Sequence, residues 1–432
     1  MYQMKTWKTF GVFALLGIAL SWLVSCSPGK VSSGGSQASG TGEVEFWTMQ
    51  LSPQFDDYFK PLIATFEKEN PGIKVRWVDV PWAEMERKIL TAVAAKTAPD
   101  VANLNPGFAS QLAERGAWMT LDDKVPADVK GQYFPNIWQA STLGNQTFGI
   151  PWYLTTRVAI YNTNILKQAG VSTPPATYAE LAQAAKQIKD KTGKYAFFAT
   201  AVPGDSGEIL ESFVQMGVQL VDAQGKAAFN SPQGKAAFQY WVDLYKNGLM
   251  PKEVLTEGHR HAIDLYQQGG TAVLASGAEF LKTIAKNAPT IAQVSESAAQ
   301  ITGDTKKKNV AVMDLVIPKD TDQPDAALKF ALFVANNDNQ LAFAKAANVL
   351  PSTIKAASDS YFTALPTNAT PIDKARIVSA GQLKDSEVLI PVMKDGKLLQ
   401  KTLYENLQAA MLGQKSVEQS LNDAAQTWNA RS

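Results

Sequence analysis

The segment EVEFWT, at residues 43–48, begins the region that sets the architecture. Its alternation predicts a strand, and IKVRW at 73–77 predicts a second one. Between them, large apolar residues at 59, 62, 63 and 66 have the spacing of an amphipathic helix, which NPG at 70–72 ends. A helix over about 83–96 and a strand over 101–104 complete a β-α-β-α-β unit. Such units form a parallel sheet covered by helices.

The alternation of strands and helices continues to the end of the chain. A strand-like run at 148–161 is followed by a helix whose start, Thr177 to Glu180, has the sequence of a capping box. Ser231 and Pro232 mark the start of another helix, which Asn247 and Gly248 end. We further predict strands at 195–200, 271–275 and 310–317, and helices at 208–221, 279–286, 324–335, 397–412 and 417–428.

The N-terminal residues have the pattern of an export signal. Lys5 and Lys8 precede an apolar run from Phe10 to Val24, which is too short for a confident membrane span of about 20 residues. We therefore predict a signal peptide at 1–25. Residues 26–42 are rich in Ser and Gly, which predicts a flexible linker.

The single cysteine of the chain, Cys26, stands between these two segments. It has no intramolecular disulfide partner, and neither neighbouring segment can belong to a core. The residues LVSC at 23–26 resemble the lipobox of bacterial lipoproteins, in which the thiol is acylated. This resemblance implies lipidation at Cys26, membrane attachment and an extracytoplasmic location.

The composition restricts the class of protein. About 390 residues remain after the leader, enough for two domains. The 41 Lys and Arg balance the 40 Asp and Glu, and only Lys306–Lys308 form a basic run, so we expect no nucleic-acid partner. With two histidines and no further ligand in sight, we expect no metal and no cofactor.

Six fragments carry a resemblance to a known family. They are VEFWTM at 44–49, FEKENPGIKV at 66–75, PDVANLNPG at 99–107, FGIPWYLTTRVAIYN at 148–162, LYKNGLMP at 244–251 and VLPST at 349–353. In this order they resemble the extracellular solute-binding proteins of sugar ABC importers, in the maltose-binding-like branch. The resemblance implies an α/β fold with two lobes, each a mainly parallel sheet flanked by helices, and a ligand cleft between them. It also implies a monomer that delivers a carbohydrate to permease subunits.

The same resemblance implies that the chain crosses between the lobes three times. We place the crossings near 152–155, near Asp314 and near Asp359. The N-terminal lobe then comprises 43–153 and 314–358, and the C-terminal lobe comprises 154–313 and 359–432.

Ligands of open α/β sheets bind beyond the carboxyl ends of the strands, and this rule selects candidate site residues. A sugar presents C–H faces to aromatic plates and hydroxyls to polar groups. Trp47, Trp82 and Trp152 are the candidate plates. Asp314 interrupts an apolar strand, where a cleft position explains a carboxylate better than a core position. Further candidates at strand ends and the presumed hinge are Gln50, Asn105, Phe108, Tyr153, Thr155, Asp205, Glu279 and Phe280, whereas Arg157 is equally well explained as an ion-pair partner.

Two other readings of the sequence remain open. An exported glycoside hydrolase needs paired carboxylates, but Asp56–Asp57 and Asp122–Asp123 are sequence neighbours that diverge on a regular element. The same fold with a non-sugar ligand such as glycerol phosphate needs several cationic donors. We therefore expect a binding protein without catalytic activity whose ligand is a di- or oligosaccharide or a glycosyl osmolyte.

Overall fold

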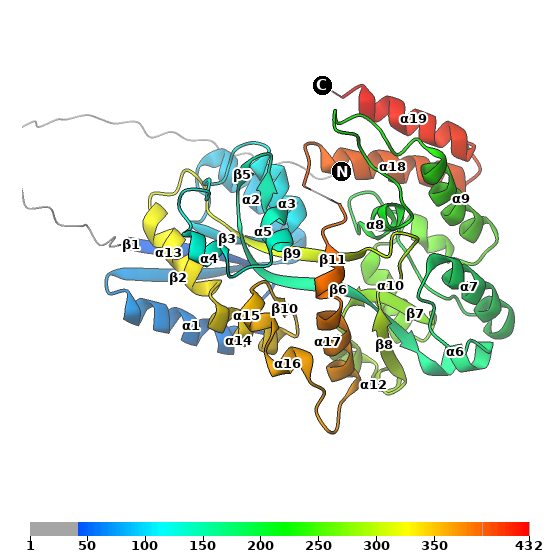
Figure 1. The fold of residues 1–432 in the computed structure, drawn as a ribbon, viewed down its shortest axis with the longest axis horizontal. Coiled ribbons are helices and arrows are strands. Elements are labelled where there is room, and N and C mark those ends of the chain that lie inside the picture. Colours follow the sequence, from blue (N-terminus) through cyan, green and yellow to red (C-terminus); the bar gives the residue numbers. More distant parts are fainter. Residues whose placement is uncertain (1–41, 391, 432) are drawn as a thin grey trace, which may run out of the picture. The chain divides into compact units, whose positions relative to one another are not determined.

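The computed structural model describes residues 42–390 and 392–431 (Figure 1). It confirms the predicted N-terminal unit, which comprises β1 (Gly42–Met49), α1 (Asp56–Glu69), β2 (Ile73–Val80), α2 (Trp82–Ala95) and β3 (Val101–Leu104). Strand β1 pairs in parallel with both β2 and β3. The carboxyl ends of these three strands therefore lie at one edge of the sheet, where α2 and α3 begin.

The other elements follow in chain order. The helices are α3 (Pro106–Ala113), α4 (Ala127–Lys130), α5 (Pro135–Ala140), α6 (Thr163–Ala169), α7 (Tyr178–Thr192), α8 (Glu208–Gln215), α9 (Pro232–Lys246), η1 (Lys252–Leu255), α10 (His259–Gln267), α11 (Phe280–Asn287), α12 (Pro289–Ala292), α13 (Pro324–Val334), α14 (Asn337–Ala347), α15 (Ile354–Ala357), α16 (Ser360–Thr363), α17 (Pro371–Gly381), η2 (Leu383–Asp385), α18 (Gly396–Met411) and α19 (Val417–Asn429). The strands are β4 (Thr142–Leu143), β5 (Gln146–Thr147), β6 (Ile150–Asn162), β7 (Val273–Gly277), β8 (Ser295–Ala299), β9 (Lys308–Val316), β10 (Leu350–Pro351) and β11 (Ser386–Glu387).

The main sheet has the order β10-β6-β9-β3-β1-β2, with β7 and β8 also paired to β6. The mixed α/β fold class is confirmed, but the parallel pairing does not extend along the whole sheet. Strand β9 runs antiparallel to β3, and β6 runs antiparallel to β9, β7 and β8. Strands β6 and β9 are long and run in opposite directions, and the shorter strands beside them pair with them.

The buried side chains form two hydrophobic cores. The first core contains Phe46, Phe59 and Trp152, together with apolar residues of α2, α13 and α14. The second core contains Phe213 and Trp241, together with apolar residues of α7, α18 and α19. Strand β6 contributes to both, because its first residues up to 154 lie in the first core and those from 158 lie in the second. The predicted lobe boundaries themselves stay predictions.

Several local predictions are confirmed at atomic detail. The Thr177 hydroxyl accepts a hydrogen bond from the Glu180 N–H, and the Glu180 carboxylate accepts from the Thr177 N–H, which completes the capping box. The Ser231 hydroxyl caps α9 by accepting from the Gly234 N–H. These caps satisfy backbone donors that a helix start leaves free.

Two local predictions are wrong. Residues 195–200 do not form a strand, because only Tyr195 and Ala196 reach the edge of β7, and the chain then leaves it. The helix predicted at 208–221 ends at Gln215, since Gly217 adopts a left-handed conformation with φ of 85°. Tertiary packing of this segment overrides the pattern of its apolar residues.

The predicted signal peptide, Cys26 and the linker as far as residue 41 lie outside the described residues. Within residues 42–390 and 392–431, no helix is long and apolar enough to cross a membrane.

Candidate functional site

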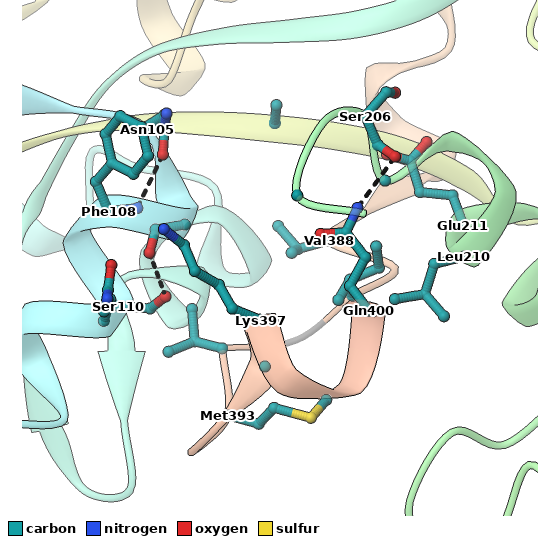
Figure 2. A pocket seen from close by; sticks show the side chains of 18 of the residues that line it. Asn105, Phe108, Ser110, Ser206, Leu210, Glu211, Val388, Met393, Lys397 and Gln400 are labelled. Carbon is teal, nitrogen blue, oxygen red and sulfur yellow. Dashed lines mark hydrogen bonds between the residues drawn. The ribbon is translucent and has the colours of Figure 1, made fainter. Parts of the chain in front are cut away.

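A cavity of about 700 Å³ lies between helices of the first core and helices of the second core (Figure 2). Its volume falls within the range of about 300–1,000 Å³ that is usual for small-molecule sites. On the first-core side, the walls come from the starts of α2 and α3. On the second-core side, they come from the loop before α8, from α8 itself, from His259 and from the segment that leads into α18.

The first-core side presents two aromatic rings, Trp82 and Phe108, which we call the aromatic wall. Trp82 is the first residue of α2 and remains 46% exposed. The Gln50 side chain accepts a hydrogen bond from the Trp82 N–H at 3.2 Å and so caps this helix. Asn105 caps α3 by accepting from the Phe108 N–H at 2.9 Å. The two helix starts therefore fix both rings at the edge of the sheet.

On the second-core side Asp205, Glu211 and His259 line the cavity, and we call these three, together with Glu208 and Arg157 behind them, the charged wall. The Arg157 guanidinium donates to both carboxylate oxygens of Glu211, at 2.8 and 3.2 Å. Its Nη2 also donates to the Ser206 hydroxyl at 3.2 Å. Figure 2 shows Ser206 and Glu211 facing the cavity opposite Asn105 and Phe108. The ion pair thus holds Glu211 in a defined position.

Glu208 and His259 form an incompletely satisfied pair in this wall. His259 Nε2 lies 3.1 Å from the Ser276 hydroxyl, and its Nδ1 lies 3.9 Å from a Glu208 carboxylate oxygen. Within the described part of the chain, neither His259 Nδ1 nor Glu208 Oε2 has a hydrogen-bond partner. Burial raises the pKa of Glu208 to about 7 and lowers the pKa of His259 to about 4.

Four of the predicted site residues line the cavity, namely Trp82, Asn105, Phe108 and Asp205. Three of them follow strands of the parallel unit, as the strand-end rule requires. Asp205 comes from the opposite side, and its carboxylate accepts from the N–H groups of Ser206 and His259, both at 2.8 Å. The structure therefore brings candidates from both cores to one cavity.

Trp47, Gln50 and Trp152 do not line the cavity. Trp47 is buried, and its indole N–H donates to Glu45 at 2.7 Å. Trp152 is fully buried and stacks on Phe343 with a centroid distance of 4.7 Å. The structure thus gives Trp152 a core position instead of the expected ligand-facing position, because aromatic neighbours enclose it on several sides.

The candidates Tyr153, Thr155, Glu279 and Phe280 are not among the residues that line the cavity. Tyr153 is buried against Trp152, and Thr155 pairs with Ala311 of β9. Phe280 packs against the second core. Burial raises the pKa of Glu279 to about 7, although this residue is outside the cavity lining.

Asp314 has a core position instead of the expected cleft position. It is 1% exposed and lies on β9 opposite Leu104 and Pro151. Its carboxylate is satisfied by the Ser141 hydroxyl at 2.5 Å, and burial raises its pKa to about 7. A hydrogen bond from a distant turn, which the sequence does not reveal, is what makes this burial tolerable.

Sequence reasoning missed the contribution of the segment that leads into α18. Ile390 and Met393 before α18 and Lys397 and Gln400 within it line the cavity. Figure 2 shows Met393, Lys397 and Gln400. The Gln400 side chain donates to the Ser206 carbonyl at 3.1 Å, which ties this segment to the charged wall. These residues carry no local motif, and the packing of α18 in the second core is what places them here. Of the two explanations that the sequence left open for Arg157, the structure shows the ion pair, with Glu211 as its partner.

Among residues 42–390 and 392–431, no group of three or more His, Cys, Asp or Glu is arranged to hold a metal ion.

Comparison with known proteins identifies the class to which this fold and cavity belong. The family model for bacterial extracellular solute-binding proteins matches residues 52–341, and the chain belongs to this family. A crystal structure assigned as an oligosaccharide periplasmic-binding protein from Synechococcus sp. MITs9220 is 44% identical, with a TM-score of 0.84 over 89% of this chain and 98% of that chain. The resemblance to maltose-binding-like proteins is thereby confirmed.

Two more distant matches are a solved structure with the same fold and a protein matched by its sequence. The cyclic alpha-maltosyl-1,6-maltose binding protein from Arthrobacter globiformis is 22% identical, with a TM-score of 0.77 over 90% of this chain and 99% of that chain. The arabinooligosaccharide-binding protein of Halalkalibacterium halodurans is 23% identical over 69% of this chain and 68% of its own length. The matched relatives are thus binding proteins.

Proposed function

We propose that the protein is a lipid-anchored substrate-binding component of an ABC importer. It captures a neutral di- or oligosaccharide, or a glycosyl osmolyte, in the cavity between the aromatic wall and the charged wall. Closure of the two lobes around the ligand then forms the state that is delivered to the permease.

The observation that carries this proposal is the complementary chemistry of the two walls. Trp82 and Phe108 offer aromatic faces to the C–H side of a sugar ring. Across the cavity, Asp205 and Glu211 offer carboxylate acceptors for hydroxyl groups, and His259 belongs to the same lining. A ligand that has an apolar face and a rim of hydroxyls satisfies both walls at once.

The charges around the cavity favour a neutral ligand over glycerol phosphate. A phosphate group is held by several cationic donors. Of the cations near the cavity, Arg157 is engaged by Glu211, and Lys397 is engaged by Glu86. The lining carboxylates are more numerous than the lining cations and comprise Glu114, Asp205, Glu211 and Asp395 against Arg115 and Lys397.

The relatives support the same ligand class. The Synechococcus protein is assigned to oligosaccharides, and the Arthrobacter protein is named for a cyclic maltosyl-maltose. Because those names belong to the relatives, the ligand of this chain must be measured.

A thermal-shift panel tests the ligand class, since a ligand that binds only the native state raises the unfolding midpoint. The panel contains neutral disaccharides, longer oligosaccharides, glucosylglycerol and glycerol phosphate. We expect a saturable shift with a neutral sugar, which is then recovered unchanged after prolonged incubation. A shift with glycerol phosphate alone contradicts the ligand class, and recovery of hydrolysed sugar contradicts the binding function.

The lipid anchor is tested separately. Replacement of Cys26 by Ala removes the acylated thiol, so the protein should move from the membrane fraction to the soluble fraction. A processed Cys26→Ala protein that stays on the membrane would disprove the anchor.

A further inference from the structure

Lys397 of α18 lines the cavity and contacts elements of the opposite side. It lies in the first turn of α18, whose apolar face, including Leu399 and Leu403, packs in the second core. Its ammonium group forms an ion pair with Glu86 of α2, a helix whose Met85 and Ile89 pack in the first core. The pair therefore joins two elements that are buried in different cores.

A second contact of Lys397 involves the aromatic wall. Its ammonium nitrogen lies 5.1 Å from the centre of the Phe108 ring, within the range of a cation–π interaction. Figure 2 shows the side chain extending from α18 toward Phe108 and Ser110. Glu86 lies one helical turn after Trp82, so the two side chains share one face of α2.

The position of Lys397 is unfavourable for its own helix. A cation in the first turn opposes the helix dipole, and the acid at this helix start, the N-cap Asp395, pairs with Arg431 at 3.5 Å. The Lys397 side chain is 44% exposed and that of Glu86 is 38% exposed. The electrostatic gain of this lysine therefore comes from α2 and α3, and not from α18.

We propose that Lys397 is a positioning residue that latches the two cores together at the mouth of the cavity. Through Glu86 and Phe108 it favours the arrangement in which the aromatic wall faces the charged wall, before any ligand binds. The latch lowers the free-energy cost of the rearrangement that accompanies ligand binding, and it slows ligand dissociation. This role serves the proposed function, but its test needs no sugar, so the two can fail independently.

The test is a distance measurement by pulsed electron paramagnetic resonance on the ligand-free protein. The sole cysteine is replaced in a Cys26→Ser background, and spin labels are attached at Thr91→Cys on α2 and Leu412→Cys just after α18. Both positions are exposed. The variants are Lys397→Gln, Glu86→Gln, the conservative Lys397→Arg and, as a matched control, Lys401→Gln. Lys401 lies one turn later in α18, where it pairs with Glu405 of the same helix.

We expect Lys397→Gln and Glu86→Gln each to increase the ratio of longer to shorter distances by about two- to fivefold, the range that partly exposed ion pairs produce. Lys397→Arg should retain the original distribution, and Lys401→Gln should leave it unchanged. High salt should move the unmodified pair toward the Lys397→Gln distribution. Unchanged distributions in both Gln variants, or an equal shift in the Lys401 control, would overturn the latch.

Discussion

The two walls of the cavity differ in how far they are already satisfied. The aromatic wall leaves Trp82 46% exposed. In the charged wall, Arg157 and Glu211 bind each other, and their side chains are only 20% and 8% exposed. The difference indicates that the Arg157–Glu211 pair is part of the structural framework, whereas the exposed Trp82 ring is accessible to a ligand. Substitutions in the two walls should therefore affect different quantities.

The largest effect is expected from breaking the ion pair of the charged wall. Arg157→Met leaves the Glu211 carboxylate buried without its partner, which should reduce the free energy of unfolding by about 3–5 kcal/mol. Urea denaturation measures the change. The control is Lys186→Met, which removes an exposed ion pair with Asp190 and should cost less than about 0.5 kcal/mol. Equal costs for the two variants would mean that the charged wall is not structural.

The aromatic wall should show the opposite behaviour. Trp82→Ala should weaken binding of the sugar found in the panel at least tenfold, about 1.4 kcal/mol, because the stacking surface is lost. It should change the free energy of unfolding by no more than about 0.5 kcal/mol. Trp152→Ala provides the contrast, with an expected stability loss of about 3–5 kcal/mol from the buried cavity it creates. Calorimetric titration and urea denaturation together separate the two tryptophans.

A smaller effect is expected on the pH dependence of the free energy of unfolding, through Glu208 of the charged wall. Burial raises the pKa of Glu208 to about 7 from an ordinary value of 4.5. The native state therefore holds a proton that the unfolded chain has lost, so the penalty is absent below pH 4.5, grows as pH rises and is complete above about pH 7. Glu208→Gln should abolish this loss, which is at most about 3 kcal/mol for a pKa raised from 4.5 to about 7.

The comparison is made between pH 5 and pH 8 by urea denaturation. His259 acts in the opposite direction, because its pKa is lowered to about 4 and its stabilisation is lost as pH falls. The Glu208 contribution is therefore defined as the difference between the variant and the unmodified protein at each pH. An identical slope in both proteins would show that Glu208 is ionised throughout.

The sequence predicts the parts of the molecule that depend on local order. The β-α-β-α-β unit follows from short-range periodicity, and the edge at which its strands end then places Trp82, Asn105 and Phe108 near a common cavity. No long-range contact is needed for this inference, because the parallel arrangement alone brings the helix starts together.

Residues whose role depends on distant neighbours escaped sequence reasoning. Trp152 and Trp82 are the same residue type, but Phe343 stacks on Trp152 in the core, whereas Trp82 stays exposed. The sequence around Asp314 predicts a cleft carboxylate, because it does not reveal that the Ser141 hydroxyl donates a hydrogen bond to it. Lys397 carries no signal at all, because its partner Glu86 is 311 positions away. Periodicity describes which face of an element is buried, but not what the rest of the chain places against it.

The central claim is that a neutral sugar binds between the two walls and needs both. Isothermal titration of the sugar identified in the panel tests it most directly, with Trp82→Ala, Asp205→Ala and the double variant compared with the unmodified protein. Circular dichroism first confirms that each variant is folded. The account predicts that each single substitution weakens binding about tenfold or more, and that the double variant gives no measurable heat. Full affinity in either single variant would mean that the ligand does not contact that wall, which would contradict the claim.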